Sequence, residues 1–167
     1  MLTNLFGLPA HVLILHATVV FVPLASLFAI GYALVPATRR HIWWVVLALA
    51  VLAPVTGWGA RISGESYRDF YLRQGASGQF IDQINKHQAF GEVTAWWATG
   101  LGVAMLVMML WVMPAVRLIP GAGTGALASR PVRVVVAVLN VALAVVALYY
   151  VIRAGDSGAH AVHSPIF

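Results

Sequence analysis

Long apolar runs alternate with short polar stretches along this chain. A membrane-spanning helix needs about 20 mostly apolar residues. Four stretches meet that requirement, at residues 11–35, 41–60, 90–113 and 132–152. The pattern predicts an all-α, integral membrane four-helix bundle, with residues 1–167 forming a single transmembrane domain.

The stretch between the second and third apolar runs, residues 61–88, is polar. Glycine and serine within residues 75–78 indicate a turn, and Phe80, Ile81, Ile84 and His87 fall on one helical face. We therefore expect a polar loop that carries one or two short interfacial helices. Residues 114–130, rich in glycine, proline and alanine, are expected to form a flexible connector, and a polar tail follows the fourth run.

The composition agrees with a membrane protein. The chain is 61% hydrophobic and 9% charged, whereas a soluble domain carries about 25% charged residues. The net charge of +5 indicates basic loops that face anionic lipid, so the expected partner is the bilayer and not nucleic acid. No cysteine is present, which excludes disulfides and thiolate metal sites. No basic segment precedes the first run, so we expect a retained span and not a signal peptide.

An even number of spans places both chain ends and the polar loop on one side of the membrane. All five acidic residues and five of the six histidines then share that side, and only His41 lies on the other. Each side carries five basic residues, so their number does not orient the chain. Because the side with Arg39 and Arg40 is purely basic, we expect it to face the cytoplasm, with both termini outside the plasma membrane.

Two histidines lie at the start of the first apolar run. Placing an ionisable side chain in hydrocarbon costs free energy. Imidazole and carboxylate groups are the usual ligands of zinc, copper and iron. The topology gathers such groups at one end, which predicts a transition-metal site in a redox context formed by His11, His16, Glu65, His87 and Asp156. On a helix His11 and His16 are separated by about 140°, so we expect one to ligate and the other to support it through hydrogen bonding.

Other interpretations of these residues stay open. A b-type haem held by His16 and His87 is the first, since haem needs two histidines on different helices. The second is an accessory subunit of a larger membrane or respiratory complex, in which the polar cluster is structural. Glu65 and Asp156 would serve equally well as helix caps or arginine partners. No nucleophile–base pair or phosphate-binding glycine loop is evident, so we do not expect an enzyme.

Several motifs occur in the order and spacing of a known family. They are Pro9-Ala10-His11 with His16, residues 19–24, Ser63-Gly64-Glu65, His87 with Gly91, and residues 155–162. In these motifs nearly the whole chain resembles a bacterial, actinobacterial-type family of four-helix membrane proteins of unknown function. It departs from that family at Val12, often a proline, and at His163, a tryptophan in the nearest branch. Some members are joined to Rieske-type iron–sulfur domains, so the resemblance implies a respiratory context without assigning a reaction.

Overall fold

The computed structural model describes residues 10–116 and 118–162, and within those ranges it contains four long helices and no strand. The long helices are α1 (Ala10–Leu34), α2 (Arg39–Arg73), α3 (Gln79–Val107) and α4 (Arg130–Val162). Three short segments join them: η1 (Pro36–Thr38), η2 (Met108–Val112), a π-helical continuation of α3, and η3 (Gly125–Ala128). The prediction of an all-helical chain with four helices is confirmed for these residues.

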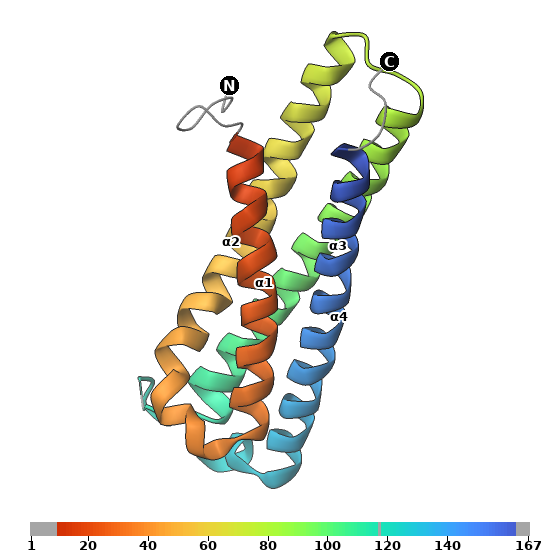
Figure 1. Ribbon diagram of the computed structural model, residues 1–167. Coiled ribbons are helices and arrows are strands. Elements are labelled where there is room, and N and C mark those ends of the chain that lie inside the picture. The colour runs from red at the N-terminus through yellow and green to blue at the C-terminus, as the bar shows by residue number, and fades with distance from the viewer. Residues whose placement is uncertain (1–9, 117, 163–167) are drawn as a thin grey trace.

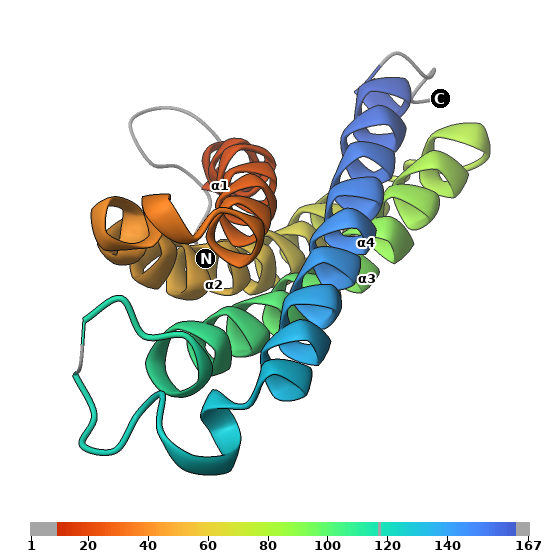
Figure 2. The same ribbon diagram turned by 90° about the horizontal axis from the view of Figure 1, so that it is seen from below.

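Each long helix packs against the next one along the chain, and α4 completes the ring by packing on α1. The start of α1, the end of α4 and the α2–α3 connection lie at one end of the molecule (Figure 1). We call this the histidine end and the opposite one the arginine end. Seen along its length, the molecule consists of an α1–α2 pair beside an α3–α4 pair (Figure 2). Helix α1 is therefore diagonal to α3.

The contact between α2 and α3 is made by small residues. Ala50 and Ala53 of α2 and Ala98 of α3 are buried. At Gly102 the two backbones are so close that a Cβ atom would overlap the carbonyl oxygen of Ala50. Between lipid-facing helices, hiding apolar side chains gives no advantage, because lipid tails are equally apolar, so close packing holds the helices together.

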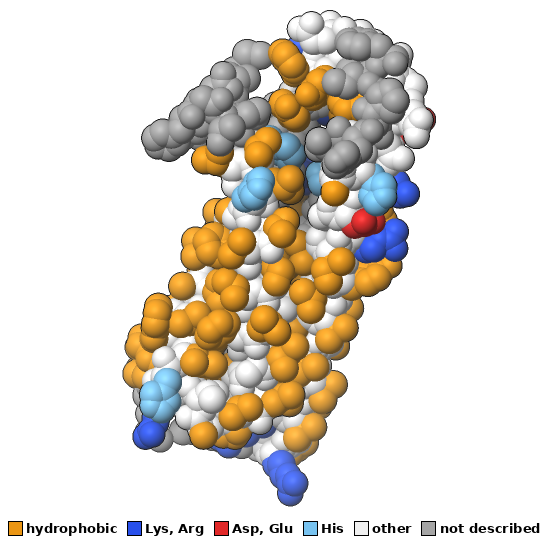
Figure 3. Space-filling model, viewed as in Figure 1, with side chains coloured by type: hydrophobic (Ala, Val, Ile, Leu, Met, Phe, Trp, Pro, Cys, Tyr) orange, Lys and Arg blue, Asp and Glu red, His pale blue; other side chains and the backbone are white. Residues whose placement is uncertain are grey.

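The outer surface of the helices is apolar as well. Trp44, Val55, Trp96 and Val138 are each about 60% exposed (61%, 61%, 59% and 63%). Apolar side chains cover the body of the molecule, whereas the charged ones lie toward its two ends (Figure 3). All four helices are long and apolar enough to cross a membrane. An apolar exterior of this extent suits lipid and not water.

Hydrogen bonds of Tyr32 and Arg39 stabilise the segments that follow α1 and η2 at the arginine end. The buried Tyr32 hydroxyl donates to the Met113 carbonyl oxygen (2.8 Å) and accepts from the Ala115 N–H (3.2 Å). Arg39 donates from Nε to the Tyr32 carbonyl oxygen (2.8 Å) and from Nη2 to that of Ala33 (2.9 Å). The last carbonyl groups of a helix have no partner within it, and Arg39 supplies partners for two of them in α1.

The prediction of a polar loop with short interfacial helices is wrong. Residues 61–73 continue α2 and residues 79–88 open α3, so residues 74–78 alone connect the two helices. Gly75 and Gly78 form this turn with φ angles of 84° and 64°, which glycine adopts without strain. Likewise α4 continues to Val162 through the stretch that the sequence suggested as a tail.

Polar side chains lie within the end portions of these helices and do not mark where the helices stop. Helix α2 has 35 residues, about 50 Å at 1.5 Å per residue, whereas the hydrocarbon core is about 30 Å thick. Its polar part is stabilised by contacts with α3: Arg61 lies 3.6 Å from Glu92, and Arg68 donates to Asn85 Oδ1 at 2.7 Å. These contacts between distant residues favour a continuous helical hairpin.

We expect Gly102→Ala to destabilise the fold, because the added methyl group would overlap the Ala50 carbonyl oxygen and push α2 and α3 apart. Overpacking of this kind costs about 1–3 kcal/mol. Gly100→Ala is the matched control, since its Cβ would lie 3.9 Å from the nearest atom, Leu143 Cδ2. Thermal unfolding in detergent compares the two variants. Equal melting temperatures would contradict the close approach.

Candidate functional site

Two histidines from diagonal helices meet at the histidine end. His11 lies at the start of α1, and His87 lies in the first third of α3. Their ring centroids are 6.4 Å apart, with the ring planes at 75° to each other. Both side chains are half-buried. Of the five predicted site residues, these two are brought together.

The hydrogen bonds of Ser63 fix which nitrogen of His11 carries a proton. The Ser63 hydroxyl donates its single proton to a carbonyl of its own helix, that of Gly59 (2.8 Å) or Ala60 (3.1 Å). Its oxygen, 3.1 Å from His11 Nδ1, therefore accepts a hydrogen bond from the ring. The Nδ1 atom of His11 is thus protonated, and Nε2 is the nitrogen with a lone pair in the neutral ring.

His87 is held in the same tautomer. Its Nδ1 lies 2.9 Å from the Ala154 carbonyl oxygen, which only accepts, and 3.3 Å from Ser157 Oγ. The Ser157 hydroxyl itself donates to Ala154 (2.9 Å). Within the described part of the chain, neither His11 Nε2 nor His87 Nε2 has a hydrogen-bond partner. A neutral imidazole held through Nδ1–H presents Nε2 to a metal, which is how ligating histidines are usually supported.

Each histidine ring also rests on a glycine of the following helix. A Cβ atom at Gly64 would lie 3.0 Å from His11 Cε1, and one at Gly158 would lie 3.0 Å from His87 Cε1. The α1–α2 and α3–α4 pairs therefore repeat one arrangement, a histidine on the first helix and a Ser-Gly step on the second. Sequence reasoning missed this repeat, although a Ser-Gly step adjoins an acidic residue in both halves, at Ser63-Gly64-Glu65 and Asp156-Ser157-Gly158.

Aromatic side chains from the helical hairpin cover His11. The Tyr67 ring stacks on it with a centroid distance of 5.8 Å and an interplanar angle of 29°. Tyr67 and Tyr71 are hydrogen-bonded through their hydroxyl groups (3.2 Å), and Tyr71 packs edge-on against Phe80 of α3 (5.0 Å). The stack fixes the rotation of the His11 ring, so the pair is ordered by packing as well as by hydrogen bonds.

The other three predicted site residues lie apart from the pair. His16 is exposed, and its Nδ1 donates to the Val12 carbonyl oxygen (2.6 Å). Glu65 pairs with Arg61 of its own helix at 3.1 Å. The exposed Asp156 carboxylate lies 3.6 Å from His160 Nδ1.

This placement changes the predicted ligand sets. Among residues 10–116 and 118–162, no group of three or more histidine, aspartate or glutamate side chains is placed to hold a metal ion. The five-residue site suggested by the sequence is therefore not assembled there. The structure pairs His87 with His11 and not with His16. His163 lies outside the described residues.

Comparison with protein-family models, with curated proteins and with solved structures finds no match to this chain. Its class rests on the fold and the site: four helices of membrane-spanning length with a half-buried histidine pair between diagonal helices. The resemblance to the actinobacterial-type family of four-helix membrane proteins stays a prediction.

We expect Gly64→Ala and Gly158→Ala each to lower the melting temperature, because the new Cβ would press on a histidine ring at 3.0 Å. The expected loss is about 1–3 kcal/mol. Gly155→Ala in α4 is the control: nothing lies within 4 Å of its Cβ, and alanine stabilises a helix over glycine by about 0.5–1 kcal/mol. The glycine packing is refuted if all three variants unfold at the same temperature.

Proposed function

We propose that this chain is a multi-pass membrane protein that binds haem b through His11 and His87 and carries electrons. One observation carries the proposal. Two imidazoles lie 6.4 Å apart, each held at Nδ1 by a hydrogen bond and with no partner at Nε2 among the described residues.

The spacing of the two rings fits a shared metal ion. Histidine nitrogens bind metal ions at about 2.0–2.1 Å, so two rings on opposite sides of one ion have centroids about 6 Å apart. The observed 6.4 Å agrees with that value. The 75° angle between the planes is compatible as well, because two rings that bind opposite sides of one metal need not be coplanar.

The number of donors favours haem over a plain metal ion. Structural zinc takes four protein ligands and catalytic zinc three, and the described residues contain no such group. A porphyrin brings four nitrogen donors of its own, so the protein need supply only the two axial ligands. Gly64 and Gly158 keep one edge of each ring free of side chains, which leaves the rings room to adjust.

Bound haem would supply one-electron transfer, and the residues of this chain would tune it. Ser63 and the Ala154 carbonyl hold the Nδ1 protons, which keeps both Nε2 atoms ready to ligate and raises the basicity of the ligands. Tyr67 limits the rotation of His11. The partial burial of both rings lowers the local polarity, which is one of the means by which a protein sets a haem potential.

The pair would lie at the edge of the plasma membrane. His11 and Leu34 are separated by 23 residue steps along α1, about 35 Å, against a hydrocarbon core about 30 Å thick. We place the histidine end outside the cell, because every acidic side chain lies there and the other end is purely basic. A site at this depth is within reach of a respiratory partner at the membrane surface.

An optical spectrum of the detergent-purified protein, oxidised and then reduced with dithionite, tests the proposal first. We expect a Soret shift and a reduced α-band with about one haem per chain. His11→Ala and His87→Ala should each abolish the signal, because each removes an axial ligand. His16→Ala is the matched control, since it removes an exposed histidine five residues away on the same helix and should leave the spectrum unchanged.

Three outcomes would overturn this assignment. Loss of the signal in His16→Ala but not in His11→Ala would restore the pair that the sequence suggested. Stoichiometric copper or zinc without haem would make the pair a plain metal site. Neither cofactor, in protein purified from cells supplied with haem precursor and metals, would favour the accessory-subunit interpretation.

The proposed orientation is tested by labelling introduced cysteines, which is direct because the chain has none of its own. Ser77→Cys places a thiol in the α2–α3 connection, and Ala126→Cys places one in η3; both positions are exposed. In right-side-out vesicles we expect an impermeant maleimide to label the first and not the second. Inside-out vesicles should reverse the pattern. The opposite result would place the histidine end in the cytoplasm.

A further inference from the structure

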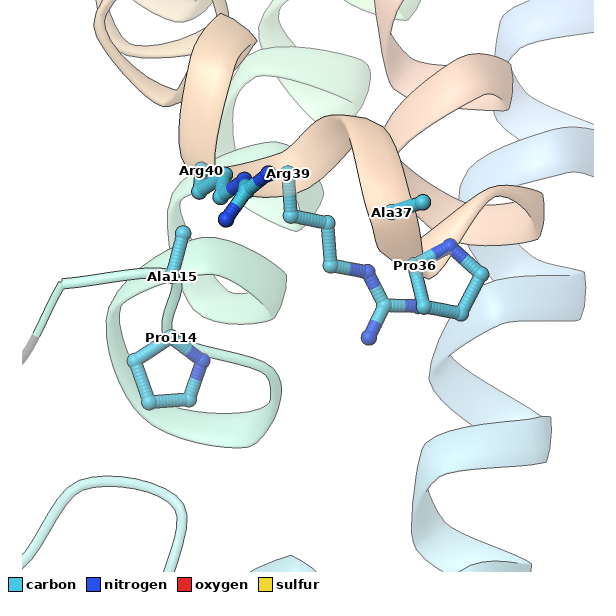
Figure 4. A pocket seen from close by; sticks show the side chains of 6 residues that line it. All are labelled: Pro36, Ala37, Arg39, Arg40, Pro114 and Ala115. Carbon is cyan, nitrogen blue, oxygen red and sulfur yellow. The ribbon is translucent and has the colours of Figure 1, made fainter.

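An open pocket of about 450 Å³ lies at the arginine end, opposite the histidine pair. Its lining comes from the η1 turn, the first turn of α2 and the segment that follows η2: Pro36, Ala37, Arg39, Arg40, Pro114 and Ala115. Figure 4 shows the two arginine side chains between Pro36 on one side and Pro114 with Ala115 on the other. Two chain segments that are far apart in the sequence therefore line one pocket, and two arginines make it basic.

Arg39 has a fixed position in this pocket. Its Nε and Nη2 atoms donate to two carbonyl oxygens at the end of α1, at 2.8 Å and 2.9 Å. The side chain is therefore held in place before any ligand arrives, and Nη1 makes no hydrogen bond that the described residues provide. Arg40 is exposed and extends into the same space.

No acidic side chain neutralises the arginine end. All five acidic residues of the chain, Glu65, Asp69, Asp82, Glu92 and Asp156, belong to the histidine end. Arg133 of α4 adds to the positive charge, since it repels Arg39 electrostatically. The pocket also opens at the start of α2, where the helix dipole favours an anion. Neighbouring guanidinium groups repel each other, and an anion bound between them would offset that repulsion.

We propose that this pocket binds the phosphate group of an anionic ligand, with the headgroup of an anionic membrane lipid as its natural source. Guanidinium groups bind phosphate oxygens through short charge-assisted hydrogen bonds, and the two prolines supply rigid apolar walls. The pocket lies where the apolar surface of the helices meets the basic end, which is the depth of lipid phosphates on that side. This site is independent of the histidine pair.

Native mass spectrometry of the detergent-purified chain, titrated with phosphatidylglycerol or with phosphatidylcholine, tests the proposal. We expect one phosphatidylglycerol per chain to bind preferentially. Arg40→Gln should weaken that binding roughly tenfold, the effect of losing one charge-assisted hydrogen bond to the phosphate. Arg130→Gln is the matched control, because it removes an exposed arginine at the same end but outside the pocket, and it should bind normally. Arg40→Lys should recover part of the affinity by restoring the charge.

A second variant leaves every charge in place. Ala37→Leu fills the pocket and should weaken phosphatidylglycerol binding while thermal unfolding stays unchanged, since Ala37 is exposed. Millimolar inorganic phosphate distinguishes the sources: displacement of the lipid would show that the pocket takes free phosphate as well, and no displacement would restrict it to the headgroup. Equal losses in Arg40→Gln and Arg130→Gln, or normal binding by Ala37→Leu, would overturn the proposal in favour of diffuse attraction.

Discussion

The contact between the backbones of α2 and α3 at Gly102 sets the spacing of the two helices through which the halves of the molecule are joined. Helices in lipid are not pressed together by water, so their separation is decided by how closely their atoms can approach. At Gly102 the Ala50 carbonyl leaves no room for a methyl group. Helix α1 packs on α2 and helix α4 packs on α3, so this contact joins the two halves of the molecule. His11 of one half and His87 of the other meet at the histidine end, with ring centroids 6.4 Å apart.

The buried hydroxyl groups of the interior differ from the histidine pair in how their hydrogen bonds are satisfied. Thr18, Ser26 and Thr94 are buried, and each donates its hydroxyl proton to the carbonyl four residues earlier in its own helix. Such groups need nothing from a neighbouring helix. His11 and His87 instead use one nitrogen each for a bond to an adjacent helix and leave the other nitrogen without a partner in the described chain. Asn140 of α4 likewise donates to a neighbouring helix, at the Ala104 carbonyl oxygen, and its Oδ1 has no partner among the described residues.

The sequence predicted the helices well because their apolar length depends on composition alone. Because the number of predicted spans is even, the sequence also predicted that His11 and His87 lie at the same end. The helical hairpin was missed because its stability depends on contacts such as Arg61–Glu92, which join residues that no local pattern relates. The sequence also contains no local sign of which histidine, His11 or His16, pairs with His87. Both interrupt the same apolar run, and only the position of Ser63 on α2 shows which one faces inward. Gly64 and Gly158 leave room for a histidine ring, and no local pattern in the sequence relates either glycine to its histidine.

The repeated histidine and Ser-Gly arrangement has a consequence for the ancestry of such a chain. Helices α1 and α3 both run away from the histidine end, so the two hairpins have the same direction along the molecule. A single hairpin with one histidine and one Ser-Gly step would therefore create the same pair by associating with a copy of itself. Once two copies are joined in one polypeptide, each half is free to diverge. The tyrosine stack over His11 is a difference between the two halves, whereas the backbone hydrogen bond is shared, since His11 bonds to the backbone of Ala60 as His87 does to that of Ala154.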